Sequence, residues 1–183
     1  DLKGIDLAEF FGQDFISLLA CSTHAPEEKL MLDSFLAARK HCPKLKFVIV
    51  PRHAERGAEL AEMLKSKNVT FLRRSTGERT GEGYVECLLA DTTGELMGFI
   101  AASDIVIMGK TLAGNHDGQN IIEPAVLGKA IVCGRELRNF REAMSILKKA
   151  DAVLTVETGD ELRRALYMLS ADPEMRNKLG RRA

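Results

Sequence analysis

The chain has 183 residues, of which 45% are hydrophobic and 28% are charged, the balance of an ordinary globular domain. Its 26 basic and 26 acidic residues cancel, so the overall charge offers no electrostatic attraction to nucleic acid. No apolar run approaches the about 18 residues that a transmembrane helix needs, and we expect this chain itself to be soluble. The four cysteines show no Cys-x-x-Cys spacing, which favours reduced thiols over a zinc or redox site.

Short apolar segments rich in β-branched residues alternate along the chain with segments of helical periodicity. Because the strands are apolar throughout and helices separate them, they predict a doubly wound parallel sheet of the Rossmann-like α/β class, covered on both faces. We assign this domain to residues 15–183 and expect residues 1–14 to be a leader or interdomain linker. In chain order, we predict a strand at 16–21, a helix at 26–41, a strand at 47–50, a helix at 55–66, strands at 69–72 and 85–90, a helix at 93–102, a strand at 105–108, a helix at 123–127, a strand at 130–133, a helix at 140–149, a strand at 152–156 and a helix at 161–170.

Three helix starts carry residues that favour N-capping. Asn139 and Thr158 each precede a glutamate by three positions, as in a capping box. Asp172 is followed directly by Pro173, which favours an N-cap and a first helical residue for a final helix.

The unusual polar residues gather where predicted strands end. In an open parallel sheet, ligands bind outside the carboxyl ends of the strands, near the point where the strand order reverses. This rule predicts a ligand site built from four segments, which are residues 22–24, 51–53, 91–95 and 109–123.

Arg52 directly follows a buried strand, and Pro51 restricts the backbone before it. A guanidinium in that place can fork onto a phosphate or a carboxylate. The alternative is a surface arginine that pairs with Glu55. The spacing alone leaves both interpretations open.

The segment 109–119 has glycines at positions 109, 114 and 118, which allow the backbone to approach a ligand and to expose amides to an anion. The helix that follows directs its N-terminus to the same place, which favours phosphate. The segment is neither a Walker loop nor a G-x-G-x-x-G fingerprint.

Glu123 has two interpretations. Asn120 and Glu123 are three positions apart and could form a capping box. Pro124 disfavours a helical residue before it, so the helix could instead begin at Pro124 and leave Glu123 outside, where its carboxylate could hold the two hydroxyls of a ribose.

We expect no metal site. His24, His53 and His116 lie in three separate loops without ligand spacing, and no Asp-x-Asp pair is present to hold a metal-bound diphosphate.

Taken together, these motifs resemble the C-terminal domain of the bacterial 3-deoxy-D-manno-octulosonic acid (Kdo) transferases, in order from about residue 15 to residue 179. The segments that carry the resemblance are Ala20-Cys21-Ser22-Thr23-His24 with Glu27-Glu28, Val50-Pro51-Arg52-His53, Leu89-Ala90-Asp91-Thr92-Thr93-Gly94-Glu95-Leu96, Gly118-Gln119-Asn120-Ile121-Ile122-Glu123-Pro124-Ala125-Val126-Leu127-Gly128-Lys129 and Asn139-Phe140-Arg141-Glu142.

The resemblance implies the donor-binding half of a two-domain GT-B glycosyltransferase, metal-independent and inverting. Such an enzyme transfers Kdo from CMP-Kdo to a lipid A precursor in lipopolysaccharide biosynthesis, at the cytoplasmic side of the inner membrane. By the resemblance, Pro51 and Arg52 would contact CMP, the backbone of residues 94–96 would receive the cytosine, and Asn120 with Glu123 would hold the ribose and phosphate region. The donor-site residues expected on this basis are Pro51, Arg52, Gly94, Glu95, Leu96, Asn120 and Glu123, with Ser22, His53, Lys110 and Gln119 as additional candidates.

The sequence departs from the family pattern in three respects. The family has Gly-Gly-His-Asn where this chain has Gly118-Gln119-Asn120, with a histidine displaced to His116. Lys110 stands where a second glycine is usual. We also expect the N-terminal domain to lie outside this chain. In the family it carries the acceptor site, the membrane-associating surface and the general base, so this chain alone should bind donor without catalysing transfer.

Two alternatives remain open. The chain could be the donor domain of another GT-B enzyme that uses a UDP-sugar, or of an epimerase. Those families often place a second glutamate eight residues after the first, where this chain has Ile131. It could also be a non-enzymatic α/β nucleotide-binding or regulatory module, although a receiver-like module would need clustered acids, and Asp91 and Asp104 are not clustered in the sequence.

Overall fold

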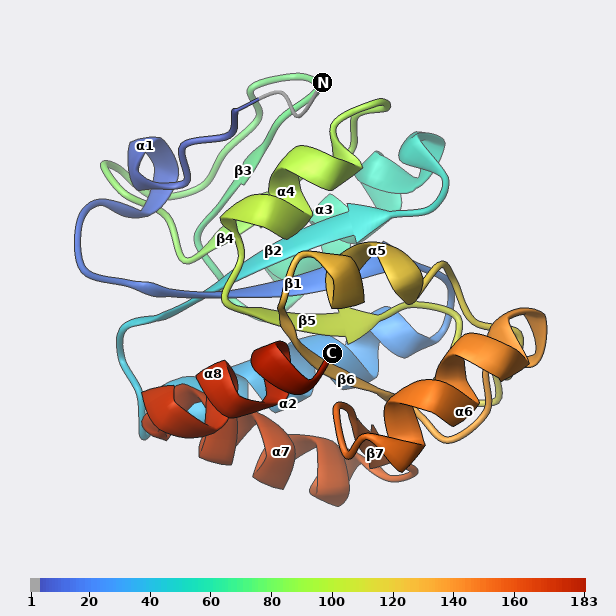
Figure 1. Cartoon of the computed structure of the whole chain (residues 1–183). Helices are drawn as coiled ribbons and strands as arrows, with labels where there is room; N and C mark the ends of the chain where they lie inside the picture. The colour runs from blue at the N-terminus through green and yellow to red at the C-terminus, as the bar shows by residue number, and fades with distance from the viewer. Residues whose placement is uncertain (1–3) are drawn as a thin grey trace.

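Seven parallel strands form the centre of the computed structural model, which describes residues 4–183 (Figure 1). Their order across the sheet is β3-β4-β2-β1-β5-β6-β7. The order therefore reverses between β1 and β5, which are direct neighbours. The strands are β1 (Ile16–Thr23), β2 (Leu45–Pro51), β3 (Phe71–Arg73), β4 (Cys87–Leu89), β5 (Ile105–Met108), β6 (Ala130–Gly134) and β7 (Leu154–Val156).

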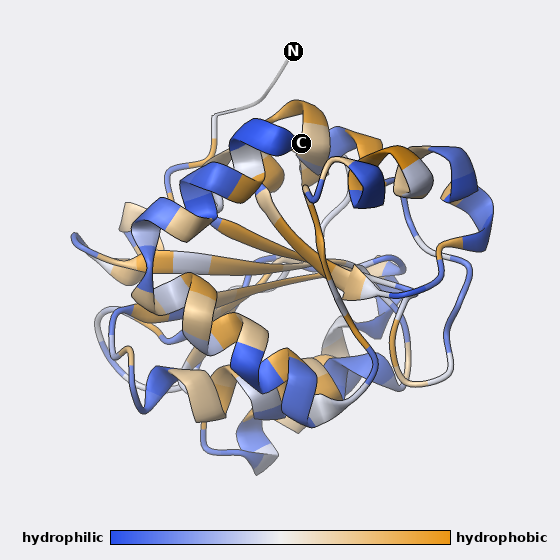
Figure 2. Ribbon diagram, turned by 60° about the horizontal axis from the view of Figure 1, so that its bottom comes forward, coloured by the Kyte–Doolittle hydropathy of each residue, from blue (hydrophilic) through white to orange (hydrophobic). Residues whose placement is uncertain are grey.

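Helices cover both faces of this sheet, and Figure 2 shows the largely hydrophobic strands between two helical layers. Successive residues of β1 point to opposite faces, as a pleated strand requires. Leu18 and Ala20 belong to one buried cluster, with residues of α2, α3 and α7. Leu19 and Cys21 belong to the other, with residues of α1, α4 and α6. The helices are α1 (Ala8–Phe11), α2 (Glu27–Arg39), α3 (Gly57–Ser66), α4 (Leu96–Ala102), α5 (Ile122–Val126), α6 (Arg141–Lys149), α7 (Gly159–Ala171) and α8 (Pro173–Arg182), with 3₁₀ turns at Ala54–Arg56 and Arg138–Phe140.

The predicted fold class is confirmed, and the predicted strands and helices are present with shifted ends. Thr158 and Asp172 are N-caps that accept hydrogen bonds from the amides of Glu161 and Met175. The predicted capping box at Asn139 is wrong. Asn139 lies inside the 3₁₀ turn, and α6 begins after Phe140 without a side-chain cap.

The predicted linker, residues 1–14, falls partly outside the described residues. Within its described part, Leu7 and Phe11 are buried in the core on one face of the sheet. The carbonyl of Phe10 accepts a hydrogen bond from the amide of Val85 at 3.0 Å. This part of the segment therefore packs as part of the domain, and its role as a link to another domain stays a prediction.

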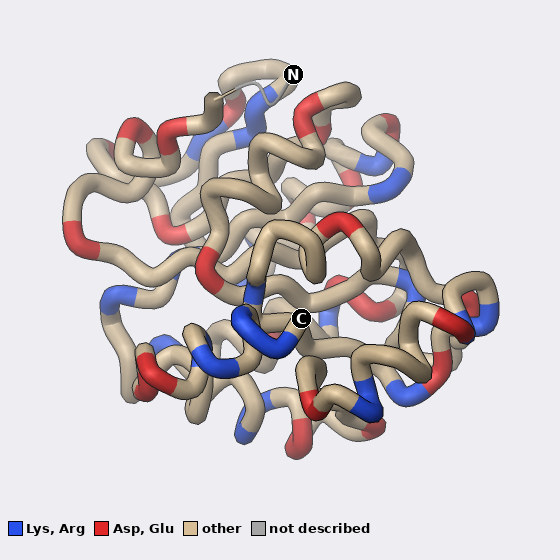
Figure 3. The backbone as a smooth tube through the Cα atoms, viewed as in Figure 1, with Lys and Arg blue, Asp and Glu red and all other residues tan. Residues whose placement is uncertain are grey.

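The four cysteines are free, and Cys21, Cys87 and Cys133 are buried. Burial raises the pKa of Cys21 and of Cys133 to about 12, so these thiols are poor nucleophiles at neutral pH. Figure 3 shows Lys and Arg interspersed with Asp and Glu along the backbone. None of the helices in residues 4–183 combines the length and the apolar character needed to cross a membrane.

Candidate functional site

A cavity of about 290 Å³ opens at the carboxyl ends of β1, β2, β4 and β5, where the strand order reverses. This is the position that the strand-end rule selects for a ligand in an open parallel sheet. Its floor is apolar and its rim is polar. The floor residues are Cys21, Val50, Ala90, Phe99 and Met108, and the rim residues are Ser22, Pro51, Arg52, Thr92, Thr93, Gly94, Glu95, Leu96, Gln119, Asn120 and Glu123.

Most of the residues selected from the sequence therefore lie together in this cleft. Two of them, His53 and Lys110, do not line it and lie beside it. Sequence reasoning misses the floor. Cys21, Val50, Ala90 and Met108 lie at or just after the ends of buried strands, so the period-2 pattern could have identified them, whereas Phe99 comes from the middle of α4 and has no local sequence signal that marks it.

Arg52 is exposed at the rim. Its backbone amide donates to the carbonyl of Thr23 at 3.0 Å, which fixes the start of the loop after β2 against the end of β1. Within residues 4–183 its guanidinium forms no ion pair, so the predicted alternative of a pair with Glu55 is not realised. A cation at the mouth of an apolar cleft is thus available to an anionic ligand.

The β4 wall of the cleft, residues 91–96, is held by side-chain contacts to the loop after β3. The buried carboxylate of Asp91 accepts hydrogen bonds from Arg73 Nε at 2.7 Å and from the Ser75 amide and hydroxyl at 3.0 and 2.6 Å. Burial by itself would raise the pKa of Asp91, but the Ser75 and Arg73 contacts outweigh burial and lower it below its ordinary value. Arg74 makes two 2.8 Å hydrogen bonds to the two oxygens of Glu95.

Glu123 lies inside α5, so the interpretation that leaves it outside the helix is wrong. The capping-box interpretation is not realised either, because the N-cap is Ile121 and makes no side-chain cap hydrogen bond. Pro124 is the third residue of α5, where the missing amide would have had no partner within the helix, so proline is tolerated there. The Asn120 side-chain amide donates to Glu123 Oε1 at 2.9 Å, and Asn120 Oδ1 accepts from the amide of Ile122 at 3.0 Å. Asn120 thus orients Glu123 and accepts the first backbone amide of α5, and both residues line the cleft.

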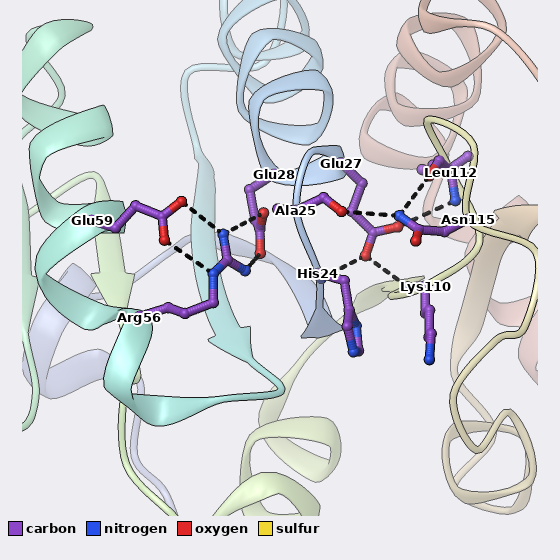
Figure 4. Close-up of polar contacts among 9 residues, drawn as sticks. All are labelled: His24, Ala25, Glu27, Glu28, Arg56, Glu59, Lys110, Leu112 and Asn115. Carbon is purple, nitrogen blue, oxygen red and sulfur yellow. Dashed lines mark hydrogen bonds and ion pairs between the residues drawn. The ribbon is translucent and has the colours of Figure 1, made fainter.

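The loop after β5, residues 109–119, is held by a buried carboxylate. We call this loop the β5 wall because it leads into the cleft, although Gln119 is its one residue that lines the cavity. Glu27, at the start of α2, is fully buried. Its oxygens accept hydrogen bonds from the backbone amides of Lys110 at 2.6 Å and of Thr111 and Leu112 at 3.2 Å, and from the amide of His24 at 2.9 Å (Figure 4). The expectation that this loop exposes its amides to a ligand anion is therefore wrong for residues 110–112, because the protein's own carboxylate already occupies them.

Glu28, the next residue, fixes the loop after β2. Its carboxylate is buried and forms two hydrogen bonds with Arg56, at 2.5 and 3.2 Å, and Arg56 also pairs with Glu59 (Figure 4). Successive carboxylates at the start of α2 thus hold two different loops around the cleft. The sequence suggests only a pair of acids in the first turn of a helix.

His24, His53 and Lys110 lie close together beside the cleft. The rings of His24 and His53 are 5.7 Å apart in an edge-to-face arrangement. Burial, then the charges of Lys110 and of His53, lower the pKa of His24. Lys110 Nζ lies 3.5 Å from a carboxylate oxygen of Asp117. Across residues 4–183, no group of three His, Cys, Asp or Glu side chains is arranged to hold a metal ion.

Comparison with known proteins connects this cleft to one family. No family model matches the chain. A 3-deoxy-D-manno-octulosonic acid transferase from Haemophilus influenzae is 36% identical over 181 residues, which are 98% of this chain and 42% of that protein. The chain thus spans less than half of this relative.

Two solved structures show the same arrangement of elements. The crystal structure of the C-terminal CMP-Kdo binding domain of WaaA from Acinetobacter baumannii superimposes with a TM-score of 0.84 at 30% identity, over 93% of this chain and 88% of that one. WaaG, a glycosyltransferase involved in lipopolysaccharide biosynthesis, has a TM-score of 0.60 at 12% identity, over 93% of this chain and 42% of that one. At this identity, WaaG shares the fold alone.

Proposed function

Because this chain belongs to the 3-deoxy-D-manno-octulosonic acid (Kdo) transferase family, in which it matches the C-terminal domain, we propose that it binds the nucleotide-sugar donor CMP-Kdo in the cleft. Such a domain forms the donor half of a GT-B glycosyltransferase. The observation that carries the proposal is Arg52, an exposed cation at the mouth of an apolar cavity, with no ion-pair partner in the described part of the chain.

Each part of CMP has a matching surface. The apolar floor around Phe99, Val50 and Ala90 suits the flat face of a pyrimidine, and the backbone of residues 94–96 can provide hydrogen bonds to its edge. Gly94 has a φ of +81° and no neighbouring atom within 4 Å of the position where a Cβ would stand. The backbone is therefore open to close approach by a base.

The ribose and phosphate fit the opposite rim. Only one hydrogen bond to the Glu123 carboxylate is described, from Asn120, and a carboxylate has room for further donors such as ribose hydroxyls. Arg52 is the candidate for the phosphate, with Pro51 at the end of β2 beside it. Ser22 and Gln119 line the cleft near them.

For the full enzyme, we propose inverting, metal-independent transfer of Kdo from CMP-Kdo to a lipid A precursor at the cytoplasmic side of the inner membrane. The general base and the acceptor site would lie in an N-terminal domain outside this chain, and membrane association would also depend on that domain. The support is family membership together with a cleft that has the exposed Arg52 at its rim. By this proposal the present chain binds donor but does not transfer sugar.

The two alternative functions gain no support from the structure. Ile131, at the position where a UDP-sugar site would place its second glutamate, is fully buried in β6. Asp91 is paired with Arg73, and Asp104 accepts hydrogen bonds from Ser17. These two acids therefore do not form the cluster that a receiver-like module needs.

The test is a calorimetric titration of this chain with CMP, with UMP, UDP and AMP as competitors. We expect selective CMP binding that Arg52→Ala weakens by on the order of 1.5–3 kcal/mol, the size of a charge-assisted phosphate contact, with folding stability unchanged. Glu123→Ala should also weaken CMP binding. Arg181→Ala, which removes an exposed arginine of α8, is the control. A preference for uridine nucleotides, or an equal loss of folding stability in Arg52→Ala, would contradict the proposal.

A further inference from the structure

Three side chains that can carry positive charge lie beside the cleft and are not needed for CMP. We call His24, His53 and Lys110 the cationic corner. The His24 and His53 rings are in edge-to-face contact, and Lys110 is close enough to affect the charge of His24. Figure 4 shows the side chains of His24 and Lys110 pointing in the same direction, away from the Glu27 carboxylate.

The corner is continuous with the cleft through three chain segments. Ser22 lines the cleft, and His24 follows it by two residues. Arg52 lines the cleft, and His53 comes next. The carbonyl of Lys110 accepts a hydrogen bond from the amide of Gly118 at 2.8 Å, and the residue after Gly118 again lines the cleft. The corner therefore lies next to three residues that line the cleft, Ser22, Arg52 and Gln119.

The backbone of Lys110 is unusual for its residue type. Its φ is +57°, a left-handed conformation that disfavours a lysine by roughly 1–2 kcal/mol and suits glycine. Glu27 holds this conformation through the Lys110 amide. A side chain kept at a position where glycine would be more stable is expected to have a use beyond folding.

The three groups repel one another when charged. Lys110 has one described acidic partner, Asp117, at 3.5 Å, and both side chains are partly exposed. The Nδ1 atom of His24 is buried, and a hydrogen bond between the ring and the Ser22 backbone raises the pKa of His24 without cancelling the effect of burial and of Lys110. An anion placed between these groups would relieve the repulsion and gain charge-assisted hydrogen bonds.

We propose that the cationic corner binds the carboxylate of an acidic sugar, and that Lys110, which replaces the glycine usual in the family, strengthens the preference of this chain for such a donor. This inference rests on the proposed function. CMP-Kdo carries two anionic groups, the phosphate and the sugar carboxylate. Arg52 at the cleft receives the first, and Lys110 with His24 and His53 receives the second. Asp117 competes with the ligand carboxylate for Lys110 and is released when the donor binds.

The experiment compares three ligands on this chain by calorimetry: CMP, CMP-Kdo, and the analogue of CMP-Kdo whose sugar carboxylate is a carboxamide. We expect the chain to bind CMP-Kdo about tenfold or more tightly than the carboxamide, the effect of one charge-assisted hydrogen bond. Lys110→Gln should abolish this preference and leave CMP affinity unchanged. Asp117→Asn should strengthen CMP-Kdo binding and leave the affinity for CMP unchanged.

Lys110→Gly separates a binding role from a structural one. It removes the side chain and the steric cost of the left-handed backbone conformation together. It should therefore preserve or raise resistance to denaturation while losing the preference for the carboxylate. Lys44→Gln removes the same charge from an exposed pair with Asp14, one residue before β2, and should change no affinity.

The outcomes distinguish this inference from the proposed function. Absence of CMP binding in the unmodified chain would contradict the proposed function itself. CMP binding without a preference for CMP-Kdo over the carboxamide would overturn only the carboxylate assignment. An equal loss of CMP and CMP-Kdo affinity in Lys110→Gln would assign Lys110 to the phosphate and also overturn the proposal.

Discussion

The β4 wall of the cleft is held by ion pairs between side chains, whereas the β5 wall is held by backbone amides that donate to one buried carboxylate. Arg73–Asp91 and Arg74–Glu95 fix the first wall, and both arginines are partly exposed. The Asp91 carboxylate is itself buried, but it accepts one backbone amide, that of Ser75. Glu27 alone receives three amides of the second wall and one of the loop after β1.

This difference predicts how each wall responds to damage. Partly exposed ion pairs contribute modestly, and loss of one leaves the other in place. Glu27 differs from Asp91 because all four of its described donors are backbone amides, whereas Asp91 accepts one backbone amide and two side-chain donors. Removal of Glu27 therefore leaves several backbone amides without this acceptor. A single substitution at Glu27 should therefore destabilise the β5 wall strongly, whereas each single substitution in the β4 wall should cost less stability.

The largest effect is expected for Glu27→Gln. A glutamine keeps one acceptor oxygen and turns an NH₂ group toward amide donors, so two or more of the four hydrogen bonds are lost. We expect the free energy of unfolding to fall by about 3 kcal/mol, measured by urea denaturation. Glu62→Gln, at an exposed position of α3, is the matched control and should stay within about 0.5 kcal/mol. An equally small change in Glu27→Gln would show that the amides are satisfied without Glu27.

Asp91→Asn comes next, with an expected loss of about 2 kcal/mol, because the ion pair with Arg73 is lost while the amide of Ser75 can still find an acceptor. The same variant tests an acid response. The pKa of Asp91 is lowered in the folded state from 3.8, so its contribution is complete above that pH and is lost as the pH falls through the folded value. The unmodified chain should lose stability below about pH 4 more steeply than Asp91→Asn.

The two walls should respond to acid with opposite signs. Burial raises the pKa of Glu27 above 4.5, although its amide donors act in the opposite direction. The folded state thus takes up a proton at Glu27 at a higher pH than the unfolded chain does, so this group by itself favours folding as the pH falls. A steeper acid loss in the unmodified chain than in Glu27→Gln would contradict this sign.

A smaller effect is expected for Arg74→Gln. The variant removes two hydrogen bonds to Glu95 and the contacts of the guanidinium with the rings of Phe10 and Phe99, each 5.7 Å away. Because the arginine is partly exposed, we expect a loss of about 1 kcal/mol. CMP affinity should fall more than stability does, since Glu95 lines the cleft. A loss as large as that of Glu27→Gln would remove the contrast between the walls.

The sequence predicts the parts of this arrangement that depend on local patterns. Apolar strands and helical spacing determine the sheet, and the carboxyl ends of parallel strands must meet at one edge, so the sequence alone is enough to select Arg52 and Glu123. Cap residues such as Thr158 and Asp172 accept hydrogen bonds from amides three residues further along the chain, so the sequence predicts them equally well.

Contacts between distant segments cannot be predicted in the same way. Glu27 lies 83 to 85 residues before the three residues of the β5 wall whose amides donate to it. A glutamate at the start of a helix gives no sign of such a role. The local pattern places Glu123 on the wrong side of a helix start, because proline is tolerated within a first helical turn. The sequence indicates that a loop surrounds the site but not which of its amides are already occupied.

The smallest effect is expected for the pH dependence of stability that His24 contributes. The His24 amide donates to Glu27, so this residue belongs to the network that holds the β5 wall. Burial and the nearby Lys110 and His53 lower its pKa from 6.5, while a hydrogen bond to the Ser22 backbone and the charge of Glu28 act in the opposite direction. As the pH falls, the unfolded chain therefore binds a proton at His24 at a higher pH than the folded chain does. The free energy of unfolding consequently decreases as the pH falls below about 6.5. His24→Asn should flatten the change in unfolding free energy between about pH 7.5 and about pH 5.5. Lys110→Gln should flatten it in part, since it removes one of the charges that oppose protonation. Because the ring is partly exposed and the charges are screened, the effect should be smaller than that of Arg74→Gln. A slope that neither variant changes would mean that the corner's charges do not act on His24 and would weaken the case for an anion between them.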